Sequence, residues 1–156
     1  MRHPHRLLVV YHSRSGGTQA MTDAVVAGAT SEDIDGVDVV VKRAFDADAD
    51  DVRACDAIVL GTPENFGYMS GALKDFLERI YYEVVDETQG RPYALYVKAS
   101  TDGSGAVRSV ERIVAGLKWR AALPPLVVTG ALDDDHFTAA RELGLTLAAG
   151  LEAGIF

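Results

Sequence analysis

The stretch RLLVVYHSRSGGTQAMTDAVVAGA, residues 6–29, joins three short patterns in succession. It begins with an apolar run, RLLVVYH, continues through the small, hydroxylated or cationic residues SRSGGT at 13–18, and ends in QAMTDAVVAGA. A short apolar run is typical of a buried strand, and apolar residues three and four apart indicate an amphipathic helix. The stretch therefore predicts a strand, a tight loop and a helix.

The same alternation continues to the end of the chain. Apolar runs of strand length, without the polar alternation of half-exposed strands, occur at 7–11, 37–41, 57–60, 93–97 and 126–128. Segments with helical spacing occupy 18–29, 48–54, 71–82, 106–117 and 137–151. This order predicts one doubly wound α/β domain over residues 1–156, a parallel sheet between two layers of helices. Ligands of such domains bind at the carboxyl ends of the strands, so function is expected in the loops that follow them.

Composition narrows the range of partners. The chain has 156 residues and a formal net charge of −8, so its acidic surface would repel nucleic acid. Its single cysteine, Cys55, cannot form an internal disulfide, which fits a reducing cytoplasm, and we expect a cytoplasmic protein. The N-terminal apolar run is too short for a signal peptide or a membrane span, and no residues have the spacing of a metal site. We expect small molecules or other proteins as partners, and neither nucleic acid, membrane nor metal.

Several known phosphate-binding loops do not fit residues 13–18. A Walker P-loop requires a lysine followed by Ser or Thr, which this loop lacks. A dinucleotide-binding fingerprint ends its second strand on an acidic residue, whereas Lys42 and Arg43 stand there. A receiver domain would need an acidic cluster after the first strand, and a cysteine phosphatase would need a thiol in the loop. The sequence has neither.

The remaining interpretation of this loop is a site for a phosphate monoester. The hydroxyl groups of Ser13, Ser15 and Thr18 can donate hydrogen bonds, and Gly16 and Gly17 allow a close approach of the backbone. The following helix directs its free N–H groups and the positive end of its dipole to the same point. A capped helix after a tight turn would use the same residue types, so the loop alone leaves both interpretations open.

A second loop carries a resemblance to a known family. The segment GTPENFGYMSGALKDFLER, residues 61–79, runs from the end of a buried strand into an amphipathic helix. With SRSGGT after the first strand, it resembles the flavodoxin-like FMN proteins, especially the NAD(P)H-dependent flavin and quinone reductases. The resemblance implies the flavodoxin-like three-layer sandwich, in which a five-stranded parallel sheet has the order 2-1-3-4-5.

The resemblance also implies a set of FMN contacts. The phosphate would be held by Ser13, Arg14, Ser15, Gly16, Gly17 and Thr18. The isoalloxazine ring would be lined by Thr62, Pro63, Glu64, Asn65, Phe66 and Gly67, and its opposite edge by Ser100, Thr101, Asp102 and Gly103. Phe66 is the predicted wall of the ring, although a loop aromatic can also fold back onto the core. A capped turn would equally explain the loop 99–105.

Other residues receive separate interpretations. Tyr68 and His136 are candidates for contact with a substrate above the ring, although helix capping by the aspartates at 133–135 also explains the surroundings of His136. Met69, Trp119 and Cys55 are predicted to pack in the core.

The implied activity is an FMN oxidoreductase that takes a hydride from NAD(P)H. Chemistry would take place at flavin N5, so no catalytic side chain is required, and the acceptor would be a quinone, a flavin or another small molecule. The alternative is an electron carrier whose acidic surface docks on redox partner proteins. Flavodoxins often place a tyrosine in the loop at 99–105 to stack on the ring, and its absence here favours the reductase. Assembly into a homo-oligomer is left open.

Overall fold

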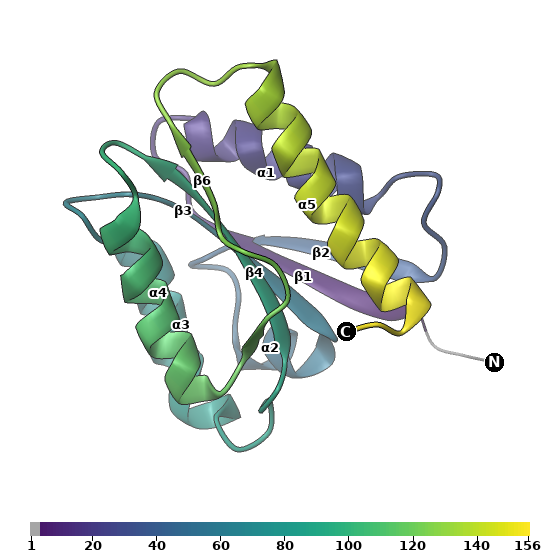
Figure 1. The fold of residues 1–156 in the computed structure, drawn as a ribbon. Coiled ribbons are helices and arrows are strands. Elements are labelled where there is room, and N and C mark those ends of the chain that lie inside the picture. The colour runs from purple at the N-terminus through teal and green to yellow at the C-terminus, as the bar shows by residue number, and fades with distance from the viewer. Residues whose placement is uncertain (1–3) are drawn as a thin grey trace.

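The computed structural model describes residues 4–156 as a parallel sheet between two layers of helices (Figure 1). The strands are β1 (His5–Tyr11), β2 (Val37–Arg43), β3 (Ala57–Pro63), β4 (Pro92–Ala99), β5 (Arg120–Ala121) and β6 (Leu126–Thr129). The helices are α1 (Gly17–Ala29), α2 (Ala49–Ala54), α3 (Gly71–Val84), α4 (Ser104–Leu117) and α5 (Asp134–Ala153). The predicted alternation of strands and helices is confirmed. None of the helices in the described chain combines the length and apolar character needed to cross a membrane.

The strand order is β2-β1-β3-β4-β5, and β6 also pairs with β4. The predicted order 2-1-3-4-5 is confirmed, with the fifth strand divided into two pieces along the same edge. Arg120 is in register with Pro92 at the start of β4, and Leu126 is in register with Tyr96 farther along it. Pro124 and Pro125 lie between the pieces and have no backbone N–H to donate, which explains why pairing stops there.

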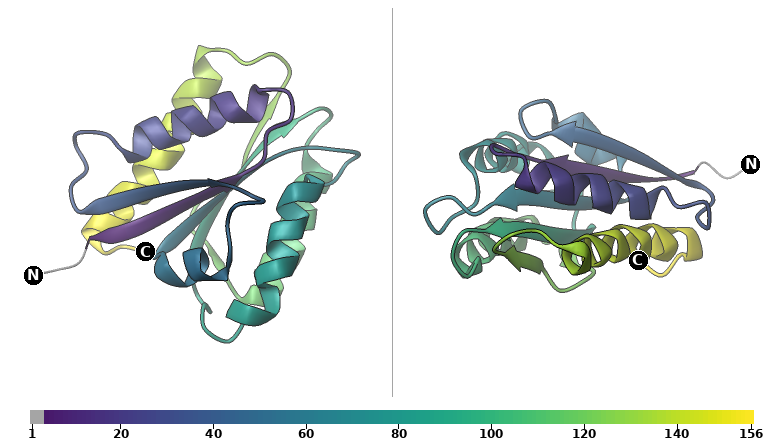
Figure 2. Two further views of the ribbon diagram at one scale, coloured as in Figure 1. Left: turned by 180° about the vertical axis from the view of Figure 1, so that it is seen from behind. Right: turned by 90° about the horizontal axis from the view of Figure 1, so that it is seen from above.

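Alternate residues of the central strands enter two separate cores. Leu8 and Val10 of β1 pack with α2, α3 and α4, whereas Leu7 and Val9 pack with α1 and α5. Figure 2 shows from behind that α1 and α5 lie side by side over one face of the sheet. The prediction of burial on both faces is wrong for the edge strands: Val41 of β2 is 41% exposed, because β2 has a neighbour on one side only.

The helices begin where the loops cap them. α4 begins at Ser104, before the predicted residue 106, since Gly103 is its N-cap in the left-handed conformation. α5 begins at Asp134, before the predicted residue 137, since the Asp133 side chain accepts a hydrogen bond from the His136 N–H. Because β1, β3 and β4 are parallel neighbours, the loops that follow them gather at one edge of the sheet (upper left in Figure 1).

Candidate functional site

The loop between β1 and α1 presents hydrogen-bond donors at the start of a helix. Gly16 is the N-cap of α1 and has a φ of 94°, a conformation that glycine adopts without strain. The Ser13 hydroxyl accepts a hydrogen bond from the Gln19 N–H at 3.0 Å. Ser13 therefore satisfies a free N–H of the first turn of α1, although Gly16 is the N-cap residue. Thr18 is only 2% exposed as a residue, and its hydroxyl makes no hydrogen bond within residues 4–156. Since no buried side-chain polar atom of these residues lacks a partner, this hydroxyl must reach the surface. An anion at this helix start would give that hydroxyl and the first N–H groups an acceptor.

Lys98 of β4 lies beside this loop, although the sequence does not predict it as a site residue. A Cβ atom at Gly17 would lie 3.4 Å from Cγ of Lys98 and 3.5 Å from its Cε, so the lysine stem runs along the first turn of α1. The Lys98 ammonium is one bond of about 1.5 Å beyond Cε, so it lies within about 5 Å of the position of that Cβ atom at Gly17. None of the ion pairs in the described chain includes Lys98. The structure therefore brings an uncompensated cation from β4 to the loop after β1.

The loop after β3 ends in a tight hairpin. The Asn65 N–H donates to the Tyr68 carbonyl at 2.8 Å, and the Tyr68 N–H donates to the Asn65 carbonyl at 3.0 Å. The two central residues, Phe66 and Gly67, have φ values of 54° and 69°, as in a type I′ turn. Phe66 is fully exposed, with a relative accessibility of 104%. The alternative in which Phe66 folds back onto the core is thus not the arrangement of this structure.

Two residues of the same loop are buried and serve to hold it. Thr62 is 0% exposed, and its hydroxyl donates to the Pro63 carbonyl and accepts from the Ser70 N–H. Glu64 is 5% exposed and directs its carboxylate into the neighbouring loop after β4. Both side chains are committed to hydrogen bonds within the protein, so they position the loop and do not present polar groups to a ligand.

The Glu64 carboxylate is the connection between the second and third loops. Its Oε1 accepts from the Thr101 N–H at 2.7 Å, the Thr101 hydroxyl at 2.8 Å, the Ser100 N–H at 3.1 Å and the Ser100 hydroxyl at 3.2 Å. Its Oε2 accepts from the Gly103 N–H at 3.1 Å. The hydrogen bond from the Thr101 N–H, followed by those from the two hydroxyls, lowers the pKa of Glu64 below its ordinary value of 4.5. The donors of this loop face Glu64, and Asp102 accepts from Ser104 at the start of α4.

The hairpin is also in contact with α4. A Cβ atom at Gly105 would lie 1.9 Å from the Gly67 carbonyl oxygen, so only glycine allows this approach. The Met69 N–H donates to the Ser109 hydroxyl at 3.1 Å, which fixes the end of the loop to the same helix. The second and third loops are therefore one preorganised unit, with the Phe66 ring as its exposed tip.

The substrate candidates differ in where the structure places them. Tyr68 is 42% exposed and lies next to Phe66 in the hairpin. His136 lies at the start of α5, where its Nδ1 accepts a hydrogen bond from the Asp133 N–H at 3.3 Å, so it completes a capping box.

The three residues predicted to pack in the core do so. Met69 is 2%, Cys55 3% and Trp119 6% exposed, and the Trp119 indole N–H donates to the Thr88 hydroxyl. Burial raises the pKa of the Cys55 thiol to about 11, so the thiol is protonated at neutral pH. Cys55 and Trp119 are components of the fold away from the three loops, whereas Met69 anchors the end of the second loop in the core.

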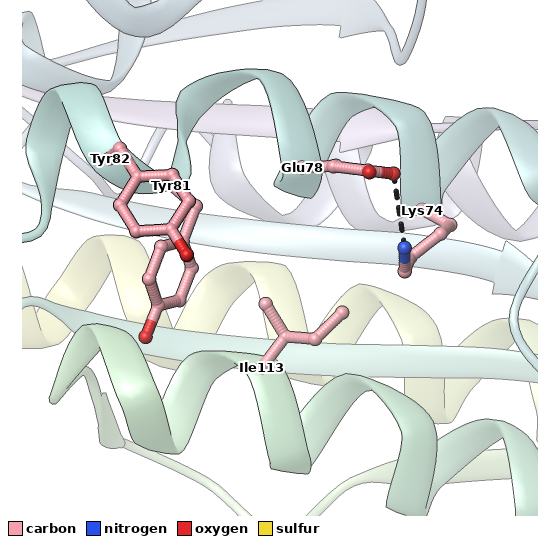
Figure 3. A pocket seen from close by; sticks show the side chains of 5 residues that line it. All are labelled: Lys74, Glu78, Tyr81, Tyr82 and Ile113. Carbon is pink, nitrogen blue, oxygen red and sulfur yellow. Dashed lines mark hydrogen bonds and ion pairs between the residues drawn. The ribbon is translucent and has the colours of Figure 1, made fainter.

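A groove on the surface of the two helices α3 and α4 contains none of the predicted site residues. This groove of about 260 Å³ is lined by Lys74, Glu78, Tyr81, Tyr82 and Ile113 (Figure 3). Within residues 4–156, no three His, Cys, Asp or Glu side chains are grouped so that they could hold a metal ion.

Solved structures with the same fold include flavodoxins. The chain superposes on a flavodoxin from the domain Archaea with a TM-score of 0.81 at 24% identity, covering 94% of this chain and 98% of that one. It superposes on a flavodoxin, WrbA-like protein from Agrobacterium tumefaciens with a TM-score of 0.77 at 18% identity, covering 97% of this chain and 99% of that one. These similarities establish the flavodoxin-like three-layer α/β fold.

Two curated relatives align with part of the chain. A protein named flavodoxin from Aquifex aeolicus (strain VF5) is 29% identical over 100 residues, 64% of this chain and 53% of that protein. An NAD(P)H dehydrogenase (quinone) from Acidithiobacillus ferrooxidans (strain ATCC 53993 / BNL-5-31) is 34% identical over 94 residues, 47% of this chain and 46% of that protein. The chain thus aligns with about half the length of each of these relatives.

The profile of a protein family covers the second and third loops. The family described as NADPH-dependent FMN reductase matches residues 35–133, which is more than half of the chain. That range includes the Phe66 hairpin, Glu64 and the loop after β4, whereas the loop after β1 lies outside it. With the flavodoxin-like fold and the three loops at one edge of its sheet, this match shows that the chain belongs to the NADPH-dependent FMN reductase family.

Proposed function

We propose that the protein is an FMN-dependent oxidoreductase that takes electrons from NAD(P)H and passes them to a quinone, a flavin or another small acceptor. Membership of the family supports FMN and a nicotinamide donor. The quinone is suggested by the name of the relative from Acidithiobacillus ferrooxidans.

The observation that carries this proposal is the Phe66 side chain. Phe66 is fully exposed, and it occupies a left-handed turn position that favours Gly, Asn or Asp. A non-glycine residue in this conformation costs about 1–3 kcal/mol, and such strain is concentrated at functional sites. An aromatic face held in this way beside two loops at strand ends is suited to packing against a flat ring.

The residues of the first loop fit the phosphate of FMN. The unpartnered Thr18 hydroxyl, Ser15 and the N-terminus of α1 provide donors, and the left-handed Gly16 places the backbone of the loop around them. Lys98 and Arg14 supply positive charge for the dianion. Ser13 contributes by fixing the first turn through Gln19.

The residues of the hairpin and of the third loop would hold the ring. FMN, when bound, supplies the hydride-accepting N5 and the route of electrons to the acceptor. Phe66 would cover a face of the ring, and Gly67 would offer its backbone N–H along the edge. Asn65, whose N–H and carbonyl are bound to Tyr68, and Pro63, whose carbonyl accepts from Thr62, would shape the loop around the ring. The loop of Ser100, Thr101, Asp102 and Gly103 would line the other edge of the ring by van der Waals contact, since the N–H groups of Ser100, Thr101 and Gly103 donate to Glu64.

An electron carrier is the second candidate function. The net charge of −8 suits docking on a basic redox partner, and the relative from Aquifex aeolicus is named flavodoxin. The third loop has no aromatic residue to cover the second face of the ring, which leaves room for nicotinamide. This favours the enzyme over the carrier.

The phosphate site can be tested by comparing FMN with riboflavin. Replacing Ser15 and Thr18 with alanine removes two donors to a charged acceptor, each worth about 1.5–3 kcal/mol. We expect FMN affinity to fall at least about tenfold, as measured by fluorescence quenching, with little change for riboflavin. Lys98→Gln should lower FMN affinity with the same selectivity.

A matched control is available at the other end of α1. Thr30→Ala with Ser31→Ala removes the same kinds of hydroxyl from the end of that helix, and we expect FMN affinity to stay unchanged. Equal losses for FMN and riboflavin in the Ser15/Thr18 variant would contradict the phosphate assignment.

A further inference from the structure

A cavity lies on the other side of the loop after β1, toward the β2 edge. It has a volume of about 430 Å³ and is lined by Tyr11, His12 and Ser13 at the end of β1, and by Arg43, Ala44, Phe45 and Asp46 at the end of β2. This volume is within the range of small-molecule sites, about 300–1,000 Å³. The FMN contacts proposed above use Ser13 from this lining but nothing from the segment 43–46.

The cavity has a free cation on its lining, although the protein is acidic as a whole and Asp46 also lines the cavity. Arg43 lines it, and within the described chain neither Arg43 nor Arg14 takes part in an ion pair. Burial, followed by the positive charges of Arg43 and Arg14, lowers the pKa of His12 below its ordinary value of 6.5. The neighbouring Lys42 is bound to Asp51 at 2.8 Å, which leaves Arg43 as the cation at the end of β2 that is free to meet an anion.

The cavity also has an aromatic wall of fixed position. Phe45 is 66% exposed and meets the His12 ring edge-on, with 6.4 Å between the ring centroids. The turn that carries it is closed by hydrogen bonds from the N–H groups of Asp46 and Ala47 to the Arg43 carbonyl. The Arg79 guanidinium donates to the Ala44 and Ala47 carbonyls at 2.8 and 2.9 Å, which holds the turn from α3. An aromatic face next to a guanidinium suits a base and a phosphate on one ligand.

The strand order sets the distance from this cavity to the flavin ring. The cavity lies at the ends of β2 and β1, whereas the proposed ring site lies at the ends of β3 and β4. Neighbouring strands are about 4.8 Å apart, so the centres of the two sites are about 10 Å apart across the sheet. A dinucleotide with its nicotinamide on the ring is long enough to place its adenosine in the cavity.

We infer that this cavity binds the adenosine end of NADPH, with Arg43 meeting the 2′-phosphate and Phe45 lying against the adenine. The inference rests on the proposed function, because it assumes that the nicotinamide meets the flavin. It adds the residue that selects the donor named in the family's description: NADH has a ribose hydroxyl where NADPH has a dianion, so Arg43 would favour NADPH. Asp46, on the same lining, carries a charge that opposes the dianion, and its removal should strengthen binding.

The test uses fragments of the two nucleotides on the FMN-loaded protein. We expect 2′,5′-ADP to bind at least about tenfold more tightly than 5′-AMP by calorimetry, and Arg43→Gln to remove this preference. Asp46→Asn should bind 2′,5′-ADP more tightly. Phe45→Leu should weaken both fragments. Arg112→Gln, an exposed arginine of α4 without an ion pair in the described chain, is the matched control and should change neither affinity.

The outcomes separate this inference from the proposed function. Equal affinities for the two fragments, no effect of Arg43→Gln, or inorganic phosphate binding as tightly as 2′,5′-ADP would overturn the NADPH assignment. None of these readouts requires hydride transfer. The proposed function fails instead if the protein binds no FMN, a result that is visible in the absorbance of the same sample before titration, and the fragments are then titrated on the flavin-free protein with the same criteria.

Discussion

At the scale of single residues, Phe66 combines an unfavourable backbone conformation with an exposed apolar side chain. Its φ of 54° places a phenylalanine where glycine or asparagine is preferred, and no core contact compensates for this. The hairpin hydrogen bonds between Asn65 and Tyr68 hold it there. A position that costs folding free energy and buries nothing is expected to be retained for binding.

Phe66→Asn should therefore separate stability from binding. We expect the free energy of unfolding to rise by about 1 kcal/mol, because asparagine tolerates the left-handed conformation. FMN affinity should fall several-fold with the loss of the aromatic face, worth about 0.5–1.5 kcal/mol. Denaturant titration of the flavin-free protein and fluorescence titration with FMN measure the two effects.

Phe66→Leu is the control for this prediction. Leucine keeps the backbone strain and removes the aromatic face, so FMN affinity should fall with no gain in stability. If Phe66→Asn destabilises the flavin-free protein, or leaves FMN affinity unchanged, Phe66 is not a strained wall of the flavin site.

At the scale of elements, Glu64 fixes the ends of β3 and β4 to each other. Five hydrogen bonds from Ser100, Thr101 and Gly103 reach its carboxylate. The pKa of Glu64 is lowered in the folded state. Between this lowered pKa and the ordinary value of 4.5, the unfolded chain therefore binds more protons than the folded protein does. The stabilisation is thus fully present above pH 4.5, the ordinary value, and is lost as the pH falls through the lowered pKa.

Glu64→Gln should lower the free energy of unfolding at pH 7 by about 1.5–3 kcal/mol, since an amide cannot accept the same set of donors. Below about pH 4.5 the difference between the variant and the parent protein should shrink. Glu78→Gln, which breaks an exposed ion pair with Lys74, should cost less than about 1 kcal/mol. A constant difference between the Glu64 variant and the parent from pH 7 to pH 3 would contradict this account.

The sequence predicted the helices and strands better than the side-chain contacts that join them. Central strands such as 57–60 were found because burial on both faces leaves an uninterrupted apolar run. The hydrogen bonds of Glu64 and the contact of Lys98 with Gly17 could not be found in this way. Both join segments more than 30 residues apart, and they follow from which strand ends are neighbours. A buried carboxylate needs donors, so a glutamate directly after an apolar strand was the available signal for the first of them.

At the scale of the whole molecule, the sheet order collects charges that are scattered along the chain. Arg14, Arg43 and Lys98 belong to three different segments, yet all lie beside the loop after β1 in a protein of net charge −8. This arrangement provides a local positive field for phosphate groups, while the acidic remainder limits non-specific binding of anions. The hairpin tip at Phe66 lies at the same edge of the sheet, where the flavin ring is proposed to bind.

The most direct test of the central claim is anaerobic mixing of the FMN-loaded protein with NADPH or NADH in a stopped-flow instrument. At least one of these nucleotides should bleach the long-wavelength absorbance of the flavin directly, by hydride transfer within a bound complex. The result that would contradict it is a flavin that neither nucleotide reduces but that photoreduction does reduce, which is the behaviour of an electron carrier.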